Sequence, residues 1–100
     1  CRGCHHCIFK EGHSCPLDND RPIIEEKMKA ADGLILISPL YAQQVTGLMK
    51  SLFDQFSYLW HRPRYFGKKA MVLVTGGAMF KETLSYMEQN AKHWGYDVVS

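Results

Sequence analysis

The chain has 100 residues, of which 46% are hydrophobic, 12% aromatic and 22% charged. This composition excludes a disordered tail, a collagen-like chain and a low-complexity linker, and the length fits one small domain. The formal net charge of +2 is too small to favour nucleic acid or a membrane surface as a partner. No apolar run reaches the roughly 18 residues that a membrane-spanning helix needs.

The first nineteen residues form a loop rich in Cys and His. It holds all the cysteines of the chain, at Cys1, Cys4, Cys7 and Cys15. A secreted disulfide scaffold spreads its cysteines along the chain to join distant loops. The clustering therefore predicts a metal site, an iron–sulfur cluster or redox-active thiols in a reducing compartment, and hence a cytoplasmic protein.

Three interpretations of the cysteines stay open. Two consecutive two-residue gaps let three thiolates converge from one tight loop, as in iron–sulfur proteins, although the longer gap before Cys15 differs from the ferredoxin spacing. Zinc accepts four thiolates, or three with a neighbouring histidine. If the thiols are free, Cys4 and Cys7 are expected to react fastest, because His5 and His6 adjoin them.

A helix is predicted over residues 20–33. Asp20 is a suitable N-cap, Pro22 is tolerated in the first turn, and Gly33 is expected to end the helix. Its apolar face is expected to hold Ile23, Ile24, Met28 and Ala31. Residues 34–37 then form an apolar run without alternation, which predicts a strand buried on both faces in a parallel sheet.

Two further helices and two further strands follow. The second helix is predicted from about residue 46 to residue 59, with apolar positions at Leu48, Met49, Leu52, Phe53, Phe56 and Leu59. Residues 70–74 are again apolar throughout, so this strand too is expected to be buried on both faces. The third helix is predicted from the helical spacing of Phe80, Leu84, Met87, Ala91 and Trp94. Gly95 is expected to cap it before the last strand begins.

The element order predicts an α/β fold with a parallel sheet covered by helices, joined by right-handed crossovers. Ligands of such sheets bind at the carboxyl ends of the strands, where this chain places the loops 38–45 and 75–79. We expect both loops to open on one crevice. Tyr41 could serve there as a platform for a planar ring system, or stand in an ordinary turn. Gly76 and Gly77 allow a ligand to approach the backbone closely, although such glycines are common in α/β loops.

Taken in order, these motifs resemble the NADPH-dependent FMN reductase family of flavodoxin-like proteins, including its iron–sulfur flavoprotein branch. After the cysteine loop, residues 30–41 (AADGLILISPLY) resemble the family's ADG turn, strand and SPxY loop. Residues 46–50 (TGLMK) with Phe53 and Asp54 resemble the start of its next helix. Residues 67–69 (GKK) and 72–77 (VLVTGG) resemble the following strand and glycine loop.

The resemblance implies a flavodoxin-like, doubly wound parallel sheet, of which residues 1–100 supply the central and later strands of one domain. It implies that FMN lies across the two crevice loops. The residues implied in FMN binding are Pro39, Leu40, Tyr41 and Ala42 at the isoalloxazine ring and Thr75, Gly76 and Gly77 at its polar edge. It also implies that the first strand and the FMN phosphate loop precede Cys1. The chain starts without Met and ends as a strand begins, so we expect it to belong to a longer protein.

The resemblance favours an oxidoreductase in which hydride passes from NAD(P)H to FMN and electrons pass to a small-molecule or protein acceptor. The flavin carries that chemistry, so no side chain is expected to act as a general acid or base. One alternative is an iron–sulfur flavoprotein that carries electrons, with a 4Fe-4S cluster on the four cysteines; another is a cofactor-free scaffold for protein contacts. The wide apolar stripe of residues 48–59, with Trp60 and Tyr65, predicts a homodimer or higher homo-oligomer.

Overall fold

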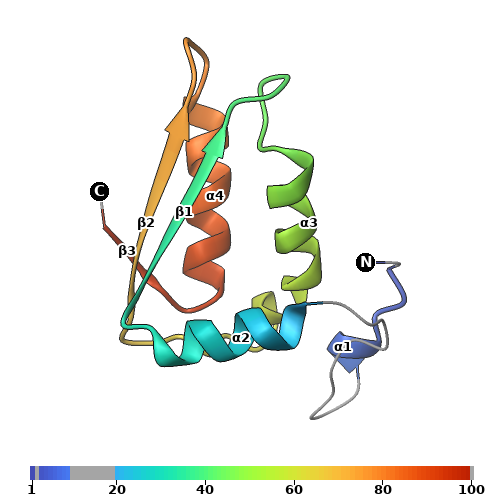
Figure 1. Ribbon diagram of the computed structural model, residues 1–100. Helices are drawn as coiled ribbons and strands as arrows, with labels where there is room; N and C mark the ends of the chain where they lie inside the picture. The colour runs from blue at the N-terminus through green and yellow to red at the C-terminus, as the bar shows by residue number, and fades with distance from the viewer. Residues whose placement is uncertain (2, 10–19, 100) are drawn as a thin grey trace.

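Three parallel strands form one sheet in the computed structural model, which describes residues 1, 3–9 and 20–99. They are β1 (Gly33–Pro39), β2 (Lys69–Thr75) and β3 (Asp97–Val99), in the order β1-β2-β3 (Figure 1). The register pairs the last residue of β1 with the last residue of β2. Both strands therefore end at the same edge of the sheet. The predicted α/β fold with a parallel sheet is confirmed.

Helices precede and connect these strands. They are α2 (Arg21–Ala30), α3 (Gly47–Gln55) and α4 (Lys81–His93), with the short α1 (His6–Phe9) before them and a 3-10 helix η1 (Ser57–Trp60) after α3. Along the chain, α3 lies between β1 and β2, and α4 lies between β2 and β3. The start of α3 is set by the Thr46 hydroxyl, which accepts a hydrogen bond from the Met49 amide at 3.1 Å. The chain leaves α4 at Gly95, whose φ of +105° lies in the left-handed region that glycine adopts easily. None of the helices in the described residues is long and apolar enough to cross a membrane.

The structure corrects the predicted course of the first helix. The helix ends at Ala30, and Gly33, predicted to stop it, is instead the first residue of β1. Ile23 is 55% exposed, and Ala31 lies beyond the helix and is exposed, so neither belongs to the buried face. The reason is helical geometry: residues 21, 24 and 28 follow the spacing of one stripe, and Ile23 lies about 100° away from it.

The second predicted helix is shorter than expected. The α-helix ends at Gln55 and the chain continues as the 3-10 helix η1, so residues 46–59 are not one helix. Leu48, predicted on the buried face, is 87% exposed. Phe80, predicted to begin the apolar stripe of the third helix, is the N-cap of α4 and is exposed. Leu48 lies in the first turn of α3, and Phe80 lies immediately before α4, so both are at helix starts rather than in the core.

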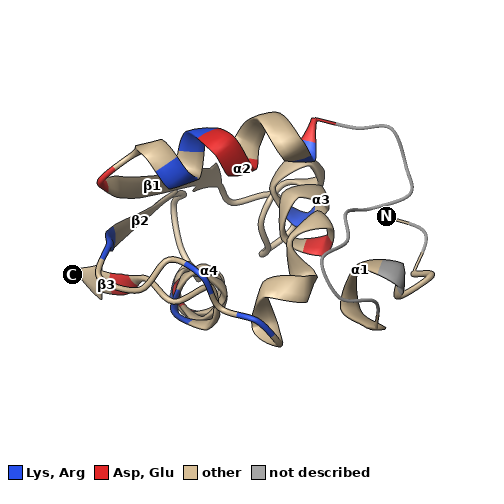
Figure 2. Ribbon diagram, turned by 90° about the horizontal axis from the view of Figure 1, so that it is seen from below, with Lys and Arg blue, Asp and Glu red and all other residues tan. Residues whose placement is uncertain are grey.

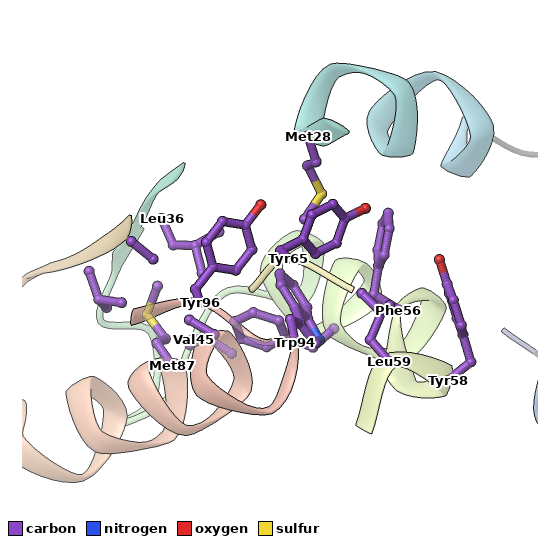
Figure 3. Packing of buried hydrophobic residues seen from close by; sticks show 14 residues of the cluster. Met28, Leu36, Val45, Phe56, Tyr58, Leu59, Tyr65, Met87, Trp94 and Tyr96 are labelled. Atoms are coloured by element: carbon purple, nitrogen blue, oxygen red, sulfur yellow. The ribbon is translucent and has the colours of Figure 1, made fainter. Parts of the chain in front are cut away.

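Aromatic side chains fill the core between the sheet and the helices. The ring of Phe53 lies edge-on to those of Trp94 and Tyr86, with centroids at 5.7 and 5.5 Å. Tyr65 stacks on Tyr96 at 5.1 Å. In Figure 3, Met28 points from α2 toward Tyr65, so the core also fixes this helix. Burial raises the pKa of the Tyr96 hydroxyl to about 12.

A polar cluster fastens the start of α2 to η1. The Arg21 guanidinium lies 4.8 Å from the ring centroid of Tyr58, and its Nε is 3.6 Å from Glu25 Oε1. The Tyr58 hydroxyl donates to the same carboxylate. Burial, and then this hydrogen bond, raise the pKa of Tyr58. The outer surface of α2 carries exposed charges of both signs (Figure 2).

Only one face of the sheet is covered by the described residues. Along β1 and β2, Leu36 and Val72 are buried, whereas Ile35, Ile37 and Leu73 are 61%, 56% and 46% exposed. The prediction that both strands are buried on both faces is therefore wrong for this part of the chain. The alternation arises because α4 packs on one side of the sheet, against β2 and β3 (Figure 1). The other side presents an apolar surface.

Candidate cofactor site

Two loops meet at the carboxyl edge of the sheet, one after β1 and one after β2 (Figure 1). The Leu40 amide donates to the Thr75 carbonyl at 2.8 Å, which extends the strand pairing past the end of β1. A Cβ placed on Gly76 would stand only 2.9 Å from the Leu40 Cβ. The loops are thus in direct contact, as the shared strand direction predicted.

The first loop contains a tight turn over residues 41–44. The Tyr41 amide donates to the Gln44 carbonyl at 2.9 Å, and the Gln44 amide donates back to the Tyr41 carbonyl at 3.0 Å. The two central residues, Ala42 and Gln43, have φ angles of +49° and +64°. Left-handed backbone costs about 1–2 kcal/mol for each residue other than glycine. The turn therefore needs support from its surroundings.

The base of this turn is fixed by buried groups. The Ser38 hydroxyl donates to the Pro39 carbonyl at 2.9 Å and accepts from the Thr46 amide at 3.2 Å. Ser38 is 1% exposed and Val45 is 7% exposed, so both ends of the loop are anchored in the core. Tyr41, by contrast, is 63% exposed. Its ring is available to a ligand on a rigid base.

The second loop presents backbone donors. A Cβ on Gly77 would meet no atom within 4 Å, so this residue borders open space. Among the described residues, the amides of Ala42, Gly76 and Gly77 donate no backbone hydrogen bond outside the strands and helices. Such exposed amides can bind the carbonyl oxygens and ring nitrogens of a planar heterocycle.

A groove of about 670 Å³ runs between β1 and α3 beside the first loop. Its lining residues are Ile37, Pro39, Tyr41, Thr46, Gly47, Leu48, Met49 and Leu52. The volume lies within the usual range of small-molecule sites, about 300–1,000 Å³. The apolar wall suits an aromatic ring system, and among the described residues no Lys or Arg lines the groove to bind a phosphate.

All seven predicted cofactor-binding residues lie at this edge of the sheet. Three residues that the sequence interpretation did not single out also belong to the region: Gln43, Met79 and Thr83. Met79 has a φ of +62°, and its sulfur accepts a hydrogen bond from Gln43 Nε2 at 3.5 Å. Nothing in the sequence marks either position, because neither Gln nor Met is a residue typical of left-handed backbone.

The cysteine segment is described only in part. Cys15 lies outside the described residues; Cys1 and Cys4 are exposed, and Cys7 is partly buried against the core. Within residues 1, 3–9 and 20–99, no three metal-binding side chains converge on one point. The segment is tied to the loop before β2, because Arg62 Nη2 donates to the Ile8 carbonyl at 3.4 Å. The four-cysteine site stays a prediction.

A parallel sheet with helices and a groove at the carboxyl ends of its strands is consistent with a flavodoxin-like α/β fold. Residues 4–95 match the family model of NADPH-dependent FMN reductases, and the chain belongs to this family. The resemblance found in the sequence is thereby confirmed.

The chain is also similar to two proteins named iron–sulfur flavoprotein. The one from Archaeoglobus fulgidus is 32% identical over 97 residues, which are 95% of this chain and 43% of that protein. The one from Methanosarcina thermophila is 35% identical over 80 residues, which are 78% of this chain and 40% of that protein. The chain thus spans about two fifths of the length of these curated relatives.

Proposed function

We propose that the protein containing this chain is an FMN-dependent oxidoreductase that takes hydride from NAD(P)H and passes electrons to a small-molecule or protein acceptor. The observation that carries the proposal is the pair of contacting loops, with an exposed Tyr41 ring and exposed amides, in a member of the FMN reductase family. FMN, when bound, supplies the chemistry of accepting a hydride and releasing electrons.

The residues of this chain bind and orient the ring system. Pro39, Leu40, Tyr41 and Ala42 are proposed to contact the isoalloxazine, with the flat Tyr41 ring as its platform. Thr75, Gly76 and Gly77 are proposed to lie at its polar edge, to which the Gly76 and Gly77 amides are proposed to donate hydrogen bonds. The FMN phosphate is proposed to bind outside this chain, because the groove has no cationic lining.

The test uses the full-length protein freed of flavin and titrated with FMN, with binding followed by quenching of flavin fluorescence. Tyr41→Ala is expected to raise the Kd for FMN about 3- to 10-fold, since an aromatic stacking contact contributes about 0.5–1.5 kcal/mol. Phe66→Ala is the matched control, because Phe66 is 71% exposed but precedes β2 at the opposite edge of the sheet. Failure of the wild-type protein to bind FMN would refute the proposal. Anaerobic addition of NADH or NADPH to the FMN complex then tests which one bleaches the flavin.

A second proposal concerns the cysteines: Cys1, Cys4, Cys7 and Cys15 bind a 4Fe-4S cluster, and the protein carries electrons between cluster and flavin. The supporting observations are the spacing of the thiols and the similarity to proteins named iron–sulfur flavoprotein. Iron and sulfide analysis of anaerobically purified full-length protein should give about four irons per chain. Cys4→Ser should lower that content. Rapid alkylation of all four thiols in the as-isolated protein would exclude both a cluster and a zinc site.

A third proposal concerns association. The exposed side chains Leu48 and Trp60 are proposed to lie in a contact between two copies of the protein. Tyr65, predicted from the sequence to share in this contact, is 2% exposed and belongs to the chain's own core. Sedimentation of the full-length protein as a dimer at micromolar concentration, weakened by Leu48→Glu, is the expected result; a monomer would refute it. A cytoplasmic location is proposed on the clustered cysteines alone.

A further inference from the structure

The strained turn of the first loop is tied to α4 by a single buried hydroxyl. Thr83 lies in the first turn of α4 and is 0% exposed. Its Oγ1 donates to the Gln43 carbonyl at 3.1 Å, across a separation of 40 residues in the sequence. A threonine at this point of a helix would ordinarily direct its hydroxyl to its own backbone. Here the hydroxyl instead leaves the helix and fixes another loop.

Gln43 is held from both of its polar ends. Its carbonyl accepts from Thr83, and its side-chain Nε2 donates to the Met79 sulfur. The two partners lie in the second loop and in the helix that follows it. Both Gln43 and Met79 have left-handed φ angles, +64° and +62°. Strained backbone conformations persist only where surrounding contacts hold them in place, and these two hydrogen bonds are such contacts for Gln43.

We propose that Thr83 is a positioning residue for the flavin: its hydroxyl keeps the turn at residues 41–44 in the left-handed conformation that aims Tyr41 and the Ala42 amide at the ring. This inference rests on the proposed FMN function. Without the hydroxyl, Gln43 relaxes toward ordinary backbone conformations, and the binding-competent turn becomes a smaller fraction of the molecules. The apparent Kd for FMN rises in inverse proportion to the fraction of molecules that keeps the binding-competent turn.

The test compares three variants of the full-length protein. Thr83→Val keeps the shape of the side chain and removes the hydroxyl, and it is expected to raise the Kd for FMN about 3- to 10-fold, the range of one lost hydrogen bond. Thr83→Ser keeps the hydroxyl and should bind FMN within about twofold of wild type. Ser85→Ala is the matched control, because this hydroxyl is exposed on the same helix.

A spectroscopic readout separates positioning from a merely structural effect. The visible circular dichroism of bound FMN reports how the ring is held, and Thr83→Val should change it while Ser85→Ala and Thr83→Ser do not.

The outcomes distinguish this inference from the proposed function. If wild-type protein binds no FMN, the proposed function fails and this inference fails with it. If wild type binds FMN and Thr83→Val matches it in Kd and dichroism, the inference alone is overturned. A Thr83→Val protein that is merely less stable, with an unchanged Kd for FMN, overturns it as well. If Thr83→Val does not fold, unchanged FMN binding by Thr83→Ala would equally overturn it.

Discussion

Gly76 and Gly77 are neighbours of identical chemistry, but the structure predicts opposite consequences for a side chain at the two positions. A Cβ on Gly76 would stand 2.9 Å from Leu40 Cβ and 3.2 Å from Leu40 Cδ2. Carbon atoms prefer a separation of about 3.5–4.0 Å. The nearest Leu40 atom is attached to the backbone, so the first loop itself must move. A Cβ on Gly77 meets no atom within 4 Å.

The difference between the two alanine variants isolates that clash. Neither glycine has a positive φ, so alanine fits the backbone at both positions. Both substitutions reduce the conformational entropy of the unfolded chain to the same extent, which raises the free energy of unfolding by about 0.4–1 kcal/mol. Overpacking costs about 1–3 kcal/mol. We therefore expect Gly76→Ala to be about 1–3 kcal/mol less stable than Gly77→Ala. Urea unfolding of the full-length protein, followed by circular dichroism, measures the free energy of each.

The variants at Gly76 and Gly77 can also be compared by their affinity for FMN. Gly77→Val is expected to leave stability near that of wild type but to weaken FMN binding about tenfold, because its side chain enters the open space beside the proposed ring edge. Gly76→Val is expected to lower both the free energy of unfolding and the affinity. Equal stability of Gly76→Ala and Gly77→Ala would refute the reasoning, since the clash with Leu40 would then have no consequence.

Three further predictions concern the core, the sheet and α3. The folded-state pKa of Tyr96, about 12, exceeds the ordinary value of 10.0, so the unfolded chain loses this proton first as the pH rises. The free energy of unfolding therefore falls by about 1.4 kcal/mol per pH unit between these two values. In urea unfolding, Tyr96→Phe should make the free energy of unfolding depend less on pH over this range. The 100-residue chain alone should bind a hydrophobic dye through its exposed sheet face, and Leu73→Lys should reduce the signal; equal dye binding by both would contradict it. Thr46→Ala should cost about 1 kcal/mol of unfolding free energy through loss of the α3 cap, whereas Thr46→Ser, which keeps the capping hydroxyl, should leave it near the wild-type value.

The order of elements and the edge that holds the site could be predicted from the sequence. Both depend on local signals: apolar runs mark the strands, and helical spacing marks the segments between them. Once consecutive strands are joined through helices, they run parallel, and their carboxyl ends must meet. The loops 38–45 and 75–79 are therefore expected to lie near each other, and the contact between Leu40 and Gly76 joins them across 36 positions.

The burial of the strands could not be predicted in the same way. An apolar run such as residues 34–37 indicates that its side chains favour an apolar environment, but not which element provides it. In the described residues, the face of Leu36 is buried and carries α4, whereas the face of Ile35 and Ile37 is open. Likewise, the end of the first helix depends on where β1 begins to pair, and Gly33 is used by the strand.

The turn at residues 41–44 escaped prediction for a different reason. Tight turns with two left-handed residues are recognised from sequence by Asn or Gly, and this turn has Ala and Gln. Its conformation is set by distant partners, Thr83 and Met79, and no local pattern announces a hydrogen bond across 40 residues. Strain that tertiary contacts maintain is the kind of feature that local reasoning misses.

The position of Thr83 connects the core of the molecule to the site. Thr83, Met87, Ala91 and Trp94 follow helical spacing, and each of them is 0% exposed, so they form one buried stripe of α4. Three members of the stripe fill the core against the sheet and its aromatic residues. The fourth carries the hydroxyl that holds the Gln43 carbonyl. Because one rigid helix bears all four, the packing that fixes α4 on the sheet also fixes the turn that presents Tyr41. The packing of the core therefore determines how closely the turn is held in the position that the proposed flavin site needs.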